Sequence, residues 1–391
     1  MNNDEHSSRD GEKREPRQTL GRRGVLRGMI AGATLSAASS ALGAIGCGDN
    51  EPPNGEPDPN GDDGRMKRID THHHALTPEM KQWMIANHLL PPNINQPWTN
   101  WDEGKALEVM KNVGIQAGVV SMPAPSDIFI DESAPDGGLS LARSGVRILN
   151  DTLADLARRH PTRFGFYAYV PLAHVDFALE EIIRSADQLG ADGFLLMNHV
   201  KNRYLGDPSF EPLFAELNRR RAVIMTHPES LPSGADGGSE ISPEIPTQIA
   251  DFMLDTTRGA LGMMWSGTLD RYPDITIILP HGGGFLPYII ERISRGHFRG
   301  EGLDPEKVRA YVRRFHYDTA GPMSLHMTPT LLATIEPDHL LYGSDYHQVP
   351  EDIVQEDLAR FLADPALDGR ARAAICRDNA LRLFPRLASR L

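Results

Sequence analysis

The chain has 391 residues, of which 40% are hydrophobic and 24% are charged, so it is long enough to enclose a large core. Its formal net charge of −13 argues against a nucleic-acid partner, because a phosphate backbone attracts basic proteins. Basic residues cluster only between Arg14 and Arg27, and we interpret this cluster as part of an export signal.

Residues 1–46 are predicted to be a twin-arginine lipoprotein signal peptide. Arg22 and Arg23 precede an apolar stretch of small residues at 29–44, and Cys47 follows in the sequence Ala-Ile-Gly-Cys. This order resembles a twin-arginine signal followed by a lipobox, with cleavage before Cys47 and lipidation of its thiol. The alternative is a transmembrane anchor, but the stretch is less apolar and shorter than the roughly 20 residues that a spanning helix needs. We therefore expect export by the twin-arginine route to the periplasm or cell surface, with membrane contact only through lipidated Cys47.

Residues 47–65 are rich in Asn, Asp, Glu, Gly and Pro and have no apolar periodicity, so we predict a disordered tether. From there, residues 66–391 alternate strand-like runs with amphipathic helical patterns and show no second domain boundary. Cys376, the other cysteine, has no partner if Cys47 is lipidated. No disulfide is therefore expected.

The first strand-like run closes with Asp70-Thr71-His72-His73-His74. In a strand, residues i and i+2 point to the same side, so His72 and His74 can bind one ion while His73 points away. Neutral imidazole is the commonest metal ligand in proteins. The alternative is a solvated histidine patch, and similar strand ends downstream argue against it.

Residues 75–101 are rich in Pro and Asn and contain Trp83, Trp98 and Trp101. We expect a long loop here, which either caps the mouth or lines the pocket of the site, or else packs as a surface excursion. Residues 231–245, rich in Gly, Ser and Pro, are expected to form a mobile loop near the site.

Eight strand-like runs follow one another with helical patterns between them, and three of the later runs end in His227, His281 and Asp345. Strand ends that converge on one face are the active-site geometry of a β/α barrel. We therefore predict one α/β domain, a (β/α)8 TIM barrel of the metal-dependent hydrolase type with insertions in its upper loops. The predicted strands lie within 66–74, 117–121, 164–170, 192–197, 222–228, 275–281, 315–318 and 340–345.

These motifs resemble the amidohydrolase-related family, in particular its decarboxylase branch, which includes aminocarboxymuconate-semialdehyde, γ-resorcylate and 6-methylsalicylate decarboxylases. The resemblance spans nearly everything from Met66 onward. It rests on residues 70–74, 164–166, 204–208, 226–228, 279–288, 341–346 and 379–381.

The resemblance implies a single divalent ion, Zn²⁺ or Mn²⁺, because three imidazoles and one carboxylate suit either metal. Binuclear members of the family carry a carboxylated lysine at the end of the fourth strand. Here that strand ends near His199, and Lys201 lies too far along the chain for this role. Among the residues outside the implied ligand set, His199 is the one most expected to contact the metal site. The implied metal ligands are His72, His74, His227 and Asp345.

His281 and Asp345 are the candidate catalytic residues, with His281 beside the metal. A substrate carboxylate and an adjacent oxygen can chelate the ion, which stabilises charge as CO₂ leaves. The ring carbon must also gain a proton, and either Asp345 or His281 can donate it. Direct attack by a metal-bound water, with His281 as its base, stays open as a second route.

The predicted function is non-oxidative decarboxylation of a small aromatic or muconate-like carboxylic acid, similar to that of 6-methylsalicylate decarboxylase. One alternative keeps the same barrel but hydrolyses a lactone or an amide with metal-activated water. A remote alternative is a non-catalytic, lipid-anchored binding protein. The resemblance also implies a possible homodimer, which no sequence feature demonstrates.

Overall fold

The computed structural model describes residues 67–232, 245–295, 302–321 and 326–391. The predicted signal peptide, the tether and all but the ends of the predicted loop at 231–245 lie outside these residues. Among the described helices, none combines the length and the apolar character that a membrane crossing requires.

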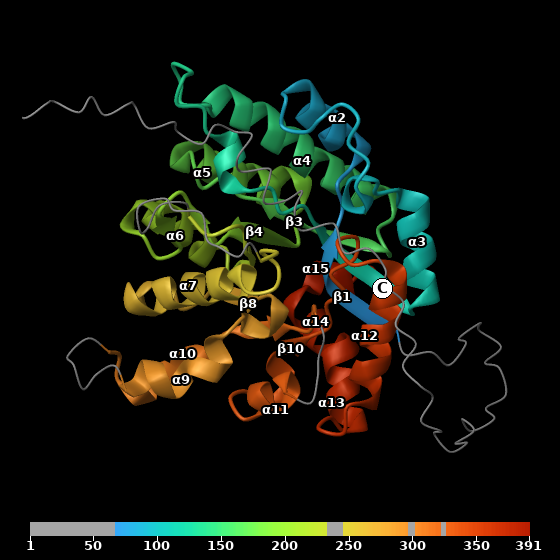
Figure 1. The fold of residues 1–391 in the computed structure, drawn as a ribbon, viewed down its shortest axis with the longest axis vertical. Helices are drawn as coiled ribbons and strands as arrows, with labels where there is room; N and C mark the ends of the chain where they lie inside the picture. The colour runs from blue at the N-terminus through green and yellow to red at the C-terminus, as the bar shows by residue number, and fades with distance from the viewer. Residues whose placement is uncertain (1–66, 233–244, 296–301, 322–325) are drawn as a thin grey trace, which may run out of the picture.

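A parallel sheet of eight strands forms the centre of the molecule, as predicted (Figure 1). Each strand pairs with the next along the sheet, and β1 also bonds to the segment after the last strand, where Thr71 N donates to Tyr342 O at 2.8 Å. This contact brings the two edges together as a nearly closed barrel. In sheet order the strands are β1 (Arg68–His74), β2 (Ile115–Ser121), β3 (Phe164–Tyr169), β4 (Gly193–Met197), β7 (Val223–His227), β8 (Thr276–Leu279), β9 (His316–Asp318) and β10 (Leu340–Leu341).

Helices surround the sheet and connect its strands, and the C-terminal helices lie beside β1 and β10 (Figure 1). A short hairpin of β5 (His199–Val200) and β6 (Arg203–Tyr204) follows β4. The helices are α2 (Pro78–Ala86), α3 (Glu103–Asn112), α4 (Leu139–Arg159), α5 (Val175–Arg184), α6 (Glu211–Arg219), α7 (Asp251–Trp265), α8 (Thr268–Arg271), α9 (Leu286–Arg295), α10 (Pro305–Arg314), α11 (Met327–Leu332), α12 (Glu351–Ala363), α13 (Gly369–Ala373), α14 (Asn379–Leu383) and α15 (Pro385–Ala388).

The barrel strands are buried on both faces, as parallel strands covered by helices must be. All of β1, β3, β4 and β7 is buried. Tyrosine hydroxyls bridge the interior, since Tyr167 OH donates to Thr71 O at 3.1 Å and Tyr169 OH donates to Ala124 O at 2.9 Å. These contacts tie β3 to β1 and to the segment after β2.

We predicted one long loop at 75–101, and this prediction was wrong. The segment contains α2 and a short 3-10 turn at Pro97–Thr99. Thr77 caps α2 by accepting from Met80 N at 3.4 Å, and Pro78 occupies the first turn, where its missing N–H costs nothing. Trp83 of this helix packs against Gly145 of α4, where an added Cβ would lie 2.3 Å from the indole ring. Tertiary packing thus orders a segment whose composition is typical of a loop.

Candidate metal centre

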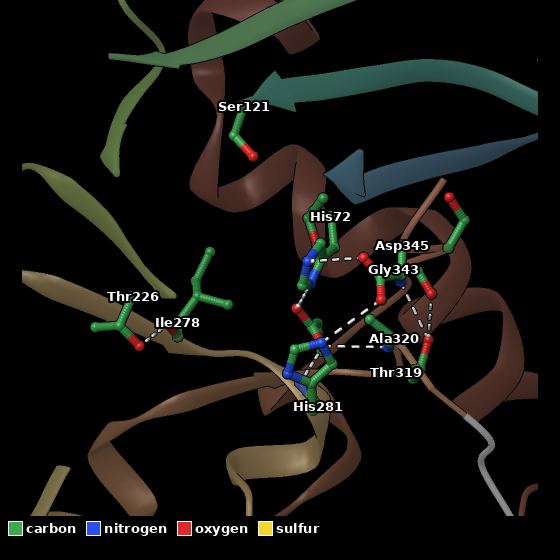
Figure 2. Close-up of polar contacts among 12 residues, drawn as sticks. His72, Ser121, Thr226, Ile278, His281, Thr319, Ala320, Gly343 and Asp345 are labelled. Carbon is green, nitrogen blue, oxygen red and sulfur yellow. Dashed lines mark hydrogen bonds and ion pairs between the residues drawn. The ribbon is translucent and has the colours of Figure 1, made fainter. Parts of the chain in front are cut away.

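The five predicted site residues converge at the carboxyl ends of the barrel strands. His72 and His74 belong to β1, and His227 ends β7. His281 and Asp345 lie beyond the last residues of β8 and β10, in turns that follow the strands. Figure 2 shows His72, His281 and Asp345 pointing toward one another.

The donor atoms of these side chains face a common point. Nε2 of His72 lies 3.0 Å from Nε2 of His74, and Nε2 of His74 lies 2.9 Å from Oδ1 of Asp345. Nε2 of His281 lies 3.7 Å from Oδ2 of Asp345. Potential ligand atoms fall within 4.8 Å of one another in two sets, His72 with His74 and His227, and His72 with His281 and Asp345.

In three of these imidazoles Nδ1, the ring nitrogen that does not face the common point, contacts a neighbouring oxygen. Such contacts fix the ring orientation and the tautomer of a ligating histidine, and they leave Nε2 directed at the ion. This arrangement suits a bound divalent cation. The pairs are His72 Nδ1 with Asp318 Oδ2 at 2.7 Å, His74 Nδ1 with Ser121 Oγ at 3.3 Å, and His227 Nδ1 with Pro228 O at 2.8 Å.

Two of the site residues sit at unusual backbone angles. His281 has φ of 53° and Asp345 has φ of 57°, in the left-handed region that residues other than glycine rarely adopt. Such conformations cost roughly 1 kcal/mol or more and persist where surrounding contacts hold them. Asp345 N donates to His72 O at 2.9 Å, and His281 N donates to Asp318 Oδ1 at 2.8 Å.

The electrostatics of the centre favour positive charge. Burial lowers the pKa of His72, but the carboxylates of Asp318 and Asp345 outweigh burial and raise this pKa to about 9. Burial lowers the pKa of His74, and burial with the neighbouring imidazoles holds the pKa of His227 well below its usual range. Burial would raise the pKa of Asp345, but His72, His281 and His74 hold it well below its usual range. The neutral imidazoles of His74 and His227 and the ionised carboxylate of Asp345 fit a bound cation, which would displace the second proton of His72.

Asp318, at the end of β9, is a functional position that sequence reasoning missed. Its Oδ2 contacts Nδ1 of His72, and its Oδ1 accepts from the backbone N–H groups of His281 and Ala320 at 2.8 and 3.1 Å. The sequence signal was available, because Asp318 closes a strand-like run just as His227 does. The carboxylate supports two site histidines at once.

Asp70 was also missed as a supporting residue. Its Oδ1 accepts from His72 N and Ser344 N at 3.1 and 3.0 Å, and its Oδ2 accepts from Ser344 Oγ at 2.6 Å. His73 Nδ1 lies 3.0 Å from the same Oδ2, so His73 faces away from His72 and His74 as predicted. Asp70 therefore joins β1 to the turn that carries Asp345.

His199 and Lys201 do not enter the centre. Nε2 of His199 lies 3.2 Å from Ser230 O and 3.4 Å from Asp255 Oδ1, and His199 belongs to neither set of potential ligands. The ammonium group of Lys201 pairs with Glu132 and is half exposed. This geometry agrees with the expectation that Lys201 is not a bridging lysine.

A mostly apolar cavity adjoins His74. Trp98 reaches it from the insertion after β1, so this part of the predicted cap does line the site. Besides His74, the cavity is lined by Leu76, Trp98, Met122, Pro123, His347 and Gln348.

The amidohydrolase family profile matches residues 69–386, which include every strand of the barrel except its first residue. The chain belongs to the amidohydrolase family. The profile match confirms the predicted family of this amidohydrolase, and its eight-stranded barrel confirms the predicted fold.

Curated relatives of this amidohydrolase include decarboxylases of fungi. It is 32% identical over 332 residues to decarboxylase yanB of Aspergillus niger, covering 82% of this chain and 88% of the relative. It is 31% identical over 334 residues to 6-methylsalicylic acid decarboxylase acuB of Aspergillus aculeatus, covering 82% of this chain and 96% of the relative.

Solved structures share the fold of this amidohydrolase. A 2,6-dihydroxybenzoate decarboxylase in complex with 2,6-dihydroxybenzoate is 25% identical, with a TM-score of 0.65 over 82% of this chain and 98% of that one. A 5-carboxyvanillate decarboxylase of Novosphingobium aromaticivorans, 20% identical with a TM-score of 0.69 over 83% of this chain and 98% of that one, holds manganese.

Proposed function

We propose that this amidohydrolase is a metal-dependent, non-oxidative decarboxylase of a small aromatic carboxylic acid, of the 6-methylsalicylate type. The observation that carries the proposal is the convergence of three imidazoles and one carboxylate at the strand ends. Relatives that cover 82% of the chain at 31 to 32% identity are decarboxylases, which supports this reaction over the others that such a centre can perform.

The proposed ligands of one divalent ion, Zn²⁺ or Mn²⁺, are His72, His74, His227 and Asp345. A bound divalent ion supplies positive charge that orients the substrate carboxylate and stabilises the charge that develops as the carbon–carbon bond breaks. The donor set does not choose between the two metals, because imidazole and carboxylate suit both.

His281 and Asp345 are proposed to handle the proton that replaces the carboxyl group on the ring carbon. Nε2 of His281 lies 3.7 Å from Oδ2 of Asp345, and the backbone N–H of His281 is fixed by Asp318. A positioned imidazole that carries a second proton can donate it to carbon and be reprotonated from water, while the ionised carboxylate of Asp345 stabilises the charged ring. The products are CO₂ and the arene with a hydrogen at the former carboxyl position.

The side chains that line the cavity beside His74 are proposed to contact the aromatic ring. The cavity has a volume of about 10 Å³, room for about one water molecule, so these side chains must move apart to admit the ring. Leu76, Trp98 and Met122 present apolar surface there, and Trp98 is 6% exposed. Apolar walls with few polar groups are typical of sites for small aromatic ligands. Exclusion of water by these side chains also strengthens the electrostatic interactions of the charged carboxylate.

The test is CO₂ release from a panel of ortho-hydroxybenzoates by the full chain reconstituted with Zn²⁺ or Mn²⁺. We expect release that requires the metal and that falls by about 100-fold or more in His281→Asn. His88→Asn is the matched control, because His88 is exposed and its φ of 59° suits asparagine.

Two outcomes would contradict the proposal that the protein is a decarboxylase. A chain that binds the metal tightly but releases no CO₂ from any acid would favour hydrolysis of a lactone or an amide by the same centre, with lactones tested next. A chain that binds no metal and shows no turnover would favour a lipid-anchored binding protein.

We further propose that the protein is exported by the twin-arginine route and anchored through a lipid on Cys47, since the N-terminal motif supports both steps. Metabolic labelling with a fatty acid tests the anchor, and Cys47→Ser should abolish the label. A homodimer is also proposed, and sedimentation of the purified chain measures it. Unlabelled wild type would contradict the anchor, and a sedimenting monomer would contradict the dimer.

A further inference from the structure

One peptide group beside the metal centre is held from outside it. Nδ1 of His227 lies 2.8 Å from the carbonyl oxygen of Pro228, so the imidazole orientation depends on where that carbonyl points. The carbonyl of Pro228 and the N–H of Glu229 belong to the same planar peptide unit. Whatever fixes the N–H of Glu229 therefore fixes the contact that orients His227.

The N–H of Glu229 donates to Oδ2 of Asp255 at 3.1 Å. Asp255 lies on α7 and is fully buried, and it makes no hydrogen bond to any of the five converging side chains.

The same carboxylate oxygen also holds the strand on the other side of His227. Nδ2 of Asn198, directly after β4, donates to Oδ2 of Asp255 at 3.2 Å. Asn198 N in turn donates to the carbonyl of His227 at 3.0 Å. One oxygen therefore holds both segments that flank His227, the peptide after it and the residue bonded to its own carbonyl.

The position of Asp255 is itself fixed by its other oxygen. Oδ1 accepts from Tyr204 OH at 2.8 Å and lies 3.4 Å from Nε2 of His199. Helix α7 also approaches β4 closely, because a Cβ added to Gly259 would lie 2.6 Å from Oδ1 of Asn198. A buried carboxylate with four partners on three chain segments is rigidly placed.

We propose that Asp255 is a positioning residue for the metal centre, acting through the Pro228–Glu229 peptide to aim Nε2 of His227 at the ion. The inference rests on the proposed function, since it takes His227 as a ligand. Without the carboxylate the peptide can rotate, the Pro228 carbonyl leaves Nδ1 of His227, and the imidazole loses its fixed direction. Supporting contacts of this kind typically contribute 10- to 100-fold in metal affinity.

The test compares two variants of the full chain, Asp255→Leu and Asp255→Asn. Leucine preserves most of the volume and removes both acceptors, so the Kd for Mn²⁺ should rise by about 10- to 100-fold. Asparagine keeps one oxygen that can accept from Glu229 and Asn198, and its amide can donate to the Tyr204 hydroxyl, so its Kd should stay within about threefold of wild type. Free Mn²⁺ is measured by electron paramagnetic resonance.

A second readout separates positioning from general destabilisation. The visible spectrum of bound Co²⁺ reports ligand geometry. It should change in Asp255→Leu and match wild type in Asp255→Asn. Melting temperatures of the metal-free proteins show that both variants are folded at the temperature of the titration. Asp255→Ser, which leaves room for water, replaces the leucine variant if that variant does not fold, and the same loss of affinity is expected.

Tight Mn²⁺ binding by a folded Asp255→Leu or Asp255→Ser, with an unchanged Co²⁺ spectrum, would overturn the inference and leave the metal centre intact. An equal loss of affinity in Asp255→Asn would also overturn it, because the charge and not the acceptor geometry would then matter. Failure of wild type to bind Mn²⁺ at all would instead contradict the proposed function.

Discussion

Oδ2 of Asp318 lies 2.7 Å from Nδ1 of His72, with both side chains fully buried. Because an ionised carboxylate only accepts hydrogen bonds, this contact keeps a proton on Nδ1, and the proton that a bound cation would displace is the one on Nε2. That nitrogen is the one that faces His74 and Asp345.

Asp318→Asn is expected to reverse this tautomer. Oδ1 already accepts two backbone N–H groups, from His281 and Ala320, so the asparagine oxygen should remain there and its NH₂ should face His72. Nδ1 must then accept, and the proton moves to Nε2, where it blocks the ion. We expect about 10- to 100-fold weaker Mn²⁺ binding, measured by titration.

Asp338→Asn is the matched control for this variant, because Asp338 lies in the 3-10 turn Pro337–His339 before β10 and its side chain is 62% exposed. Nitrogen-15 chemical shifts of the metal-free proteins, recorded above about pH 9 where His72 has lost its second proton, report the tautomer of His72 directly. Unchanged shifts in Asp318→Asn would contradict the argument even if the affinity fell.

Removal of the metal is expected to lower the melting temperature. A ligand that binds only the folded state at 100 times its Kd stabilises that state by about 2.7 kcal/mol, which is roughly 3 to 4 °C for a chain of this length. Calorimetry with and without a chelator measures the shift, and added Mn²⁺ should restore it. A variant lacking both His72 and His74 should melt at the same temperature in either condition, and a metal-dependent shift in that variant would place the ion elsewhere.

Gly343→Ala is expected to destabilise the protein and to weaken metal binding. An alanine Cβ would lie 2.8 Å from Cβ of His72 and 3.3 Å from Cβ of Ala320, so β1 or the segment after β9 must shift. Overpacking of this kind costs about 1 to 3 kcal/mol. Urea unfolding measures the loss, and Gly369→Ala, with no atom within 4 Å of the added Cβ, should cost nothing. Equal stability of the two variants would contradict the clash.

His316 is expected to make folding sensitive to acid. Burial, with the stacked ring of His339 at 4.6 Å, lowers the pKa of His316 from 6.5 to about 4. Between these two values the unfolded chain binds the proton and the folded chain does not, so stability rises with pH across this window and is lost as pH falls from about 6.5 to 4. The loss from this group is at most about 3 kcal/mol.

His316→Phe keeps a ring against His339 and removes the titration. Urea unfolding at pH 7 and at pH 4 should show a smaller difference for this variant than for wild type. If the two proteins lose equal stability between these values, the folded pKa of His316 is not depressed.

The sequence was sufficient for the barrel and for the five converging residues, because each depends on a local pattern. Strand-like runs alternate with helical stripes, and His227 and Asp345 stand at or just beyond the ends of such runs. The helix α2 was missed because its Thr77-Pro78 start lies in a segment whose Pro and Asn content favours a loop.

Asp70 and Asp318 could not be assigned from local patterns. Their partners are distant in the chain, since Asp318 contacts a histidine 246 residues away and Asp70 contacts a serine 274 residues away. An aspartate at a strand end looks the same whether it binds an ion, supports a ligand or caps a helix. Only the closed barrel, which brings β1 against β9 and β10, separates these roles.

The same closure bears on how the protein matures. His72 and His74 come from the first strand and Asp345 follows the last, so the centre spans the seam of the barrel. Contacts between distant segments form slowly, because a long loop must close before they are made. During synthesis the first strand emerges long before its partner exists. A complete binding centre is thus available only to a finished chain, and the rate of metal uptake during refolding measures the final step of barrel closure.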